Sequence, residues 1–91
     1  MSWMNVKNLS IFQELLAKQP NEPEVWCGFA YALQYGHSNH RGAVDAYRRA
    51  LELKPDHATA LNNLGYLYAN VFKDRDGAEG CYRKAIASNP T

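Results

Sequence analysis

The sequence from Pro55 to Pro90 reads PDHATALNNLGYLYANVFKDRDGAEGCYRKAIASNP, and a similar stretch precedes it by 35 residues. The shift pairs Pro20 with Pro55, Tyr31 with Tyr66, Gly42 with Gly77, Ala43 with Ala78, Tyr47 with Tyr82, Arg48 with Arg83, Ala50 with Ala85 and Pro55 with Pro90. Self-similarity at one fixed period in this range is typical of stacked structural repeats rather than of one closed core. The sequence therefore predicts a repeat protein.

The composition fits one small globular domain without a strong electrostatic field. The chain has 91 residues, of which 46% are hydrophobic and 21% are charged, and this is an ordinary globular balance. Ten lysines and arginines against nine aspartates and glutamates leave a formal charge of +1. A nearly neutral chain has no field that attracts nucleic acid or an anionic membrane surface. We therefore expect neither nucleic acid nor a membrane as a partner.

The cysteines and the hydropathy indicate the compartment. Cys27 and Cys81 lie far apart and form no Cys-x-x-Cys pair, which argues against a disulfide framework and against a thiol-ligated zinc site. No apolar run approaches the roughly 18 residues of a membrane span. The opening residues MSWMNVK also lack the basic and apolar regions of a signal peptide. A cytoplasmic location is the expectation.

Apolar residues recur at three- and four-residue spacing in five segments, and this period predicts five helices. The apolar stripes are Val6, Leu9, Phe12, Leu15 and Leu16; Trp26, Phe29, Ala30 and Leu33; Ala43, Ala46, Tyr47, Ala50, Leu51 and Leu53; Leu61, Leu64, Gly65, Tyr68 and Val71; and Ala78, Tyr82, Ala85 and Ile86. Pro20, Pro55 and Pro90 mark helix ends, because proline disfavours helical backbone at the preceding residue. Residues 36–40, GHSNH, read as a loop. The expected fold is all-α, a five-helix superhelix of antiparallel helix-turn-helix repeats.

The residues of these stripes resemble tetratricopeptide repeats (TPRs). One repeat pattern is Trp26-x-x-Phe29-Ala30-x-x-Leu33 with Ala43-x-x-x-Tyr47, Ala50 and Pro55, and the other is Leu61-x-x-Leu64-Gly65-x-x-Tyr68 with Ala78-x-x-x-Tyr82, Ala85 and Pro90. The resemblance implies a single domain over residues 1–91, with a leading helix in 1–20, a first repeat in 21–55 and a second repeat in 56–91. The period of 35 residues exceeds the usual 34, and the extra residue falls between the two helices of each repeat. Longer inter-helix loops also make the chain similar to Sel1-like repeats.

In such repeats the first helix of each pair lines a concave surface that binds partners. By resemblance, the residues on this surface are Cys27, Tyr31, Gln34 and Tyr35 from the first repeat and Asn62, Asn63, Tyr66 and Asn70 from the second. Members that bind the acidic tails of chaperones use a clamp of lysine, arginine and asparagine side chains. Cys27 and Tyr31 stand where the clamp has lysine and asparagine, and only Asn63 matches, so this partner is disfavoured. We expect a peptide or a partner helix, whose backbone is bound by Asn62 and Asn63 and whose side chains are covered by Tyr31 and Tyr66.

Two alternatives to peptide binding stay open from the sequence. Tyr31 and Tyr66 are at positions where tyrosine is often half-buried between neighbouring helices and only packs. Self-association is the second alternative, because no helix is expected after Pro90 to cover the last repeat, as solenoids usually require. An exposed apolar patch there would mark a homo-oligomer or part of a longer array. The candidates for this patch are Leu67, Tyr68, Tyr82 and Ile86.

Catalysis and metal binding have little support in the sequence. His37 and His40 lie close together, but no third ligand follows at a matching spacing, so we expect no metal site. Cys27 as the nucleophile of a hydrolase or transferase would need a base and an orienting group, and no histidine lies near it in sequence. His57 reads as a linker residue. The sequence therefore predicts a non-enzymatic interaction module or scaffold without a cofactor.

Overall fold

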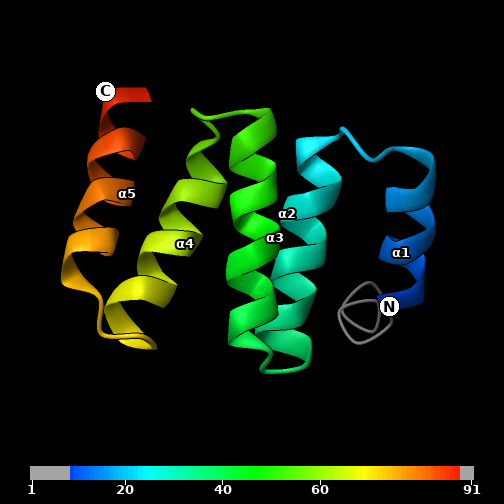
Figure 1. The fold of residues 1–91 in the computed structure, drawn as a ribbon, viewed down its shortest axis with the longest axis horizontal. Helices are drawn as coiled ribbons and strands as arrows, with labels where there is room; N and C mark the ends of the chain where they lie inside the picture. The colour runs from blue at the N-terminus through cyan, green and yellow to red at the C-terminus, as the bar shows by residue number, and fades with distance from the viewer. Residues whose placement is uncertain (1–8, 89–91) are drawn as a thin grey trace.

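The computed structural model describes residues 9–88, and in this part the chain forms helices and no strands. The elements are α1 (Leu9–Lys18), α2 (Pro23–Tyr31), the π-helix η2 (Ala32–Gly36), α3 (His40–Leu53), α4 (Ala58–Asn70) and α5 (Arg75–Ser88). The α-helices follow one another along the longest axis, from α1 in blue to α5 in orange and red (Figure 1). The predicted all-α repeat fold with five helices is confirmed over these residues. Val6 of the first stripe and the helix-ending Pro90 lie outside them.

The loop predicted at residues 36–40 is shorter in the structure. The helix of α2 continues as η2 to Gly36, and α3 already begins at His40. Ala32, Leu33 and Gln34 of η2 are all buried, so this turn keeps its backbone groups paired by staying helical. A π-turn holds one residue more than an α-turn, and the helix can therefore absorb residues that the sequence assigned to a loop.

The two loops that connect α2–η2 to α3 and α4 to α5 share one geometry. In each, a residue with left-handed backbone precedes an N-cap residue, whose side chain accepts a hydrogen bond from a glycine N–H. These residues are Ser38 (φ 52°), Asn39 and Gly42 in the first loop and Lys73 (φ 57°), Asp74 and Gly77 in the second. The cap bonds are 2.9 and 3.0 Å long. Both loops lie where the sequence placed the extra residue of the period.

Small residues let the helices of each pair approach closely. A Cβ at Gly65 of α4 would lie 2.8 Å from the ring of Tyr82, so that ring occupies the space a side chain would take. Between α1 and α2, the Phe12 ring likewise occupies the space over Gly28, where a Cβ would lie 2.8 Å from it. Tyr47 of α3 has 0% of its surface exposed and is the largest side chain of the core. The fold is therefore built from large rings packed against glycine and alanine.

The helices form a linear stack. The extensive contacts join helices adjacent in the chain, and they are largest between α4 and α5 and between α2 and α3. The contact between α3 and α4 joins the two helix pairs, and α1 packs on α2. None of the helices in residues 9–88 has the length and apolar character that crossing a bilayer requires.

Candidate partner-binding site

Three tyrosines gather on the face formed by α2, η2 and α4, and we refer to Tyr31, Tyr35 and Tyr66 as the tyrosine cluster. Tyr31 and Tyr35 lie one helical turn apart, and their ring centroids are 4.6 Å from each other. Partial burial raises the pKa of Tyr35, and the Tyr31 and Tyr66 hydroxyls raise it further. Their exposed fractions are 48%, 56% and 48%. The cluster is therefore open to a partner.

Two asparagines of α4 lie on the surface of the same helix as Tyr66. Asn62 and Asn70 are both exposed. The Asn70 side chain donates a hydrogen bond from Nδ2 to the Tyr66 carbonyl oxygen at 3.1 Å. Its Oδ1 can still accept a hydrogen bond, since an amide side chain is both donor and acceptor.

A buried hydrogen-bond network lies beneath this surface. The Tyr47 hydroxyl donates to Gln34 Oε1 at 2.9 Å and accepts from Asn63 Nδ2 at 3.1 Å. Burial raises the pKa of Tyr47 far above its usual range, against the opposing effect of the Asn63 bond. Gln34 is only 4% exposed. Gln34, which the sequence placed on the binding surface, is thus a structural residue that joins η2 to α3.

Cys27 is also buried, and its neighbour is His57, the residue that the sequence assigned to a linker. The Cys27 sulfur lies 3.8 Å from His57 Nδ1 and 3.9 Å from Nε2. His57 precedes α4, and its Nδ1 accepts a hydrogen bond from the Ala60 N–H at 3.2 Å. The ring proton of neutral His57 is therefore on Nε2, which donates to Glu24 Oε2 at 2.9 Å.

Cys27, His57 and Glu24 have the composition of a catalytic triad but not its chemistry. Burial and, second, the charge of Glu24 raise the pKa of Cys27 to about 11, whereas a nucleophilic cysteine must be a thiolate. Nδ1 of His57 already binds the helix N-terminus and is not free to act as a base. Sequence reasoning missed His57 and Glu24. The position of His57 directly before an apolar helix was the available signal, because such positions favour polar caps.

The structure adds no metal ligands to His37 and His40. Within residues 9–88, no three histidine, cysteine, aspartate or glutamate side chains are grouped so that they could hold a metal ion.

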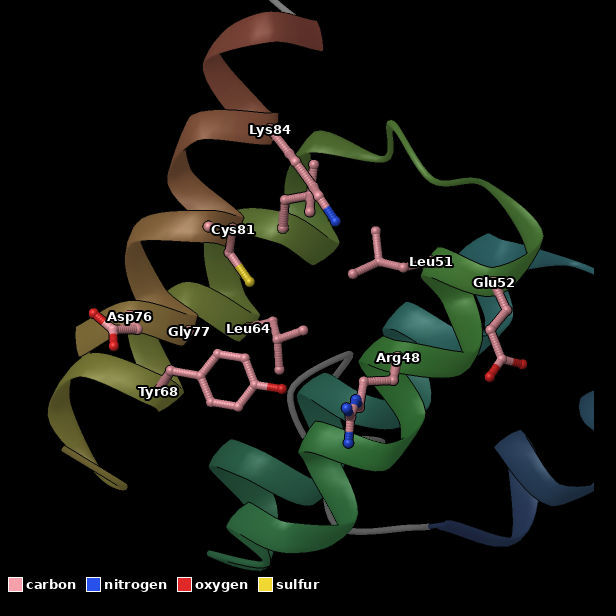
Figure 2. A pocket seen from close by; sticks show the side chains of 11 residues that line it. Arg48, Leu51, Glu52, Leu64, Tyr68, Asp76, Gly77, Cys81 and Lys84 are labelled. Atoms are coloured by element: carbon pink, nitrogen blue, oxygen red, sulfur yellow. The ribbon is translucent and has the colours of Figure 1, made fainter. Parts of the chain in front are cut away.

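A groove of about 400 Å³ runs between α3 and α5, and Leu61, Leu64 and Tyr68 of α4 also line it. Figure 2 shows Arg48, Leu51 and Glu52 on its α3 side and Cys81 and Lys84 on its α5 side. A hollow of about 470 Å³ lies one period earlier. Most of the residues of α2, η2 and α3 that line it are equivalent to residues of α4 and α5 that line the first groove. Burial raises the pKa of Cys81, which keeps this thiol protonated near neutral pH. The two grooves repeat with the helices and follow from their packing.

The surface of the last helix pair is open. Tyr82 is 38% exposed and Ile86 67% exposed, and they border a hollow of about 360 Å³. One period earlier, Tyr47 is 0% exposed, because α4 packs on α3 there. Of the predicted self-association residues, Tyr68 is half-buried. The prediction for Leu67 is wrong, because this side chain is 0% exposed and belongs to the core.

Comparisons with known proteins agree with this architecture. Residues 39–71 match the family model described as TPR repeat, a segment that runs from the cap of α3 to the end of α4. A peroxisomal targeting signal receptor of Candida albicans (strain SC5314 / ATCC MYA-2876) is 32% identical over 79 residues, which is 87% of this chain and 12% of the receptor. The chain therefore spans a small part of the curated relative that it matches.

Proposed function

The chain belongs to the tetratricopeptide-repeat family, and from this membership we propose that it is a non-catalytic protein-interaction module. In this proposal residues 1–20 form a leading helix, and residues 21–55 and 56–91 form two repeats. The concave face across α2, η2 and α4 binds a peptide or a helix of another protein. The tyrosine cluster contacts partner side chains. Asn62 and Asn70 bind the partner backbone, and Asn70 replaces the predicted Asn63, which is half-buried and donates to the Tyr47 hydroxyl. The location is cytoplasmic, where free cysteines such as Cys27 and Cys81 are usual.

The observation that carries this proposal is the exposure of the tyrosine cluster. Tyrosine is enriched at protein interfaces, because its ring buries a large area at little entropic cost and its hydroxyl group forms hydrogen bonds. Tyr31, Tyr35 and Tyr66 each keep about half of their surface exposed. The raised pKa of the Cys27 thiol supports a non-catalytic role. A relative named as a receptor for a targeting signal also fits partner recognition.

A pull-down with matched variants tests the concave face. The tagged chain is compared with the double variant Tyr31→Ala/Tyr66→Ala and with Phe72→Ala, which removes an exposed ring outside the cluster. We expect proteins captured by the parent chain to be lost from the double variant and retained by Phe72→Ala. Circular dichroism of each variant verifies that the helices persist. Equal capture by the folded double variant and the parent would contradict the proposal.

Self-association is the second candidate, favoured by the open surface of the last helix pair. Tyr82 and Ile86 of α5 are exposed, whereas Tyr47, the equivalent of Tyr82, is buried where α4 packs on α3. An apolar surface of this kind favours contact with another helix face. The occupant in this proposal is a second copy of the chain.

Light scattering at several concentrations tests self-association. We expect the mass of the parent chain to rise with concentration, and Ile86→Glu to remain a monomer because it places a charge in the contact. Tyr66→Glu, a matched change on the concave face, should still associate. A strict monomer for the parent chain at high concentration would remove this candidate.

A further inference from the structure

The charged residues of the chain are distributed unequally between its helices. α2, η2 and α4 contain no lysine and no arginine, and Glu24 is the only charged residue among their 27 positions, counted as nine, five and thirteen. α3 and α5 carry charges of both signs, including Arg41, Arg48, Arg49, Arg75, Arg83 and Lys84. The helices of the proposed binding face thus offer no cation that could attract an acidic partner, although the chain as a whole is nearly neutral.

Two arginines of α3, Arg41 and Arg49, make cation–π contacts with rings outside the tyrosine cluster. The Arg41 guanidinium carbon lies 5.8 Å from the ring centroid of Phe72, and that of Arg49 lies 5.9 Å from the ring of Trp26. These are the cation–π contacts found within residues 9–88. The tyrosine cluster belongs to neither contact, although it is the most exposed group of rings in this part of the chain.

The cluster has the chemistry of a cation site. The faces of aromatic rings carry negative partial charge, and a lysine or arginine side chain within about 6 Å of a ring centroid is attracted to them. The rings of Tyr31 and Tyr35 have an interplanar angle of 47°, and their centroids are 4.6 Å apart. Tyr66 contributes a third ring from the next helix pair. Glu24 lies seven residues before Tyr31 on α2 and therefore on the same side of the helix, about 10 Å away along its axis.

We propose that the tyrosine cluster binds a positively charged side chain, lysine or arginine, of a partner peptide. This inference rests on the proposed function, since it names the partner chemistry of the same face. An acidic side chain finds no counter-charge on α2, η2 or α4. An uncharged apolar side chain gains contact area on the rings but not the attraction to their faces.

Capped alanine pentapeptides with one central guest residue are the probes. The guest is lysine, arginine, norleucine or glutamate, so that charge varies while the length of the aliphatic part stays similar between lysine and norleucine. Amide chemical shifts of the isotope-labelled chain are followed by NMR during titration. We expect the amides of Tyr31, Tyr35 and Tyr66 to shift, with the lysine and arginine peptides bound at least about fivefold more tightly than the norleucine peptide.

Variants of one ring test whether the face of the tyrosine is responsible. Tyr66→Leu should weaken lysine-peptide binding about two- to fivefold, the contribution of one exposed ring, whereas Tyr66→Phe keeps the ring and should bind within about twofold of the parent. Phe72→Leu is the control, because it removes an exposed ring outside the cluster, and it should leave binding unchanged. Circular dichroism establishes that each variant is folded. Loss of binding in Tyr66→Phe would overturn the cation inference in favour of hydroxyl bonding.

The peptides separate this inference from the proposed function. If the norleucine or glutamate peptide shifts the same amides as strongly as the lysine peptide, the cation inference is overturned while peptide binding on this face stands. If no peptide shifts the amides of α2, η2 and α4, both are overturned. A preference for either basic peptide supports the inference, and the ratio of the two affinities shows which basic residue the site prefers.

Discussion

Cys27 is a thiol whose ionisation opposes folding. Its sulfur packs against His57, and burial together with the nearby Glu24 carboxylate raises its pKa from an ordinary 9.0 to about 11. Between these two values the unfolded chain has lost a proton that the folded chain retains. The unfolded state then binds fewer protons, so the free energy of unfolding falls as the pH rises.

We predict that this contribution to stability is fully present below pH 9 and is lost as the pH rises to about 11, at a total of about 3 kcal/mol for two pKa units. Urea denaturation at a series of pH values under reducing conditions measures the loss. Cys27→Ala should be less stable than the parent below pH 9 because of the cavity, but with a smaller fall between pH 9 and 11. Cys81→Ala is the control, because Lys84 and Arg48 oppose the rise in the pKa of Cys81. An equal fall in Cys27→Ala and the parent would contradict the prediction.

The surroundings of Cys27 also show which properties of single residues could not be predicted from the sequence. A period of 35 residues placed Cys27 and Gln34 on the first helix of a pair, and both are on it. Their depth was not predictable, because it depends on how far the next helix pair covers them. His57 is 30 residues from Cys27 and reaches it only because α4 starts beside α2. Spacing within one helix contains no information on such a contact.

The helices α3 and α5 each begin at an N-cap residue with the same hydrogen-bond geometry. The Asn39 side chain accepts from the Gly42 N–H at the start of α3, and the Asp74 side chain accepts from the Gly77 N–H at the start of α5. A cap bond of this kind satisfies a helix donor that has no partner within the helix. The same geometry occurs 35 residues apart, so the two caps form an internal comparison.

We predict that Asn39→Ala and Asp74→Ala each lower the free energy of unfolding by about 1 kcal/mol. Chemical denaturation followed by circular dichroism measures the change. Asn62→Ala, an exposed change inside α4, is the control and should stay within about 0.5 kcal/mol of the parent. A loss in the control as large as in the cap variants would contradict the assignment to capping.

At the scale of elements, the five apolar stripes were sufficient to predict the helices. The stripe from Trp26 to Leu33 and its counterpart from Leu61 to Tyr68 both lie on helices that the structure contains. The π-turn of η2 was not predictable. The residues that follow the two stripes differ, and only the first continues as a π-helix, to Gly36.

The whole molecule is a row of helices in which each packs mainly on its neighbours in the chain. In such a stack stability is a sum of local terms, and the ends open before the middle. The described part of α1 has no fully buried residue, and its extensive contact is with α2 alone. α3 buries five residues and contacts α2, η2 and α4.

We therefore predict that α1 detaches in a local opening that leaves the other helices folded. Native-state hydrogen exchange at low urea concentrations measures this as opening free energies for the α1 amides that lie more than about 1 kcal/mol below those of α3. Phe12→Ala removes the ring that fills the space over Gly28 and should lower the opening free energy of α1 without changing that of α3. Val44→Ala, inside α3, should lower the opening free energy of α3 and leave that of α1 unchanged, because the extensive contact of α1 is with α2. Equal protection of α1 and α3 in the parent chain would mean that the stack unfolds as one cooperative unit.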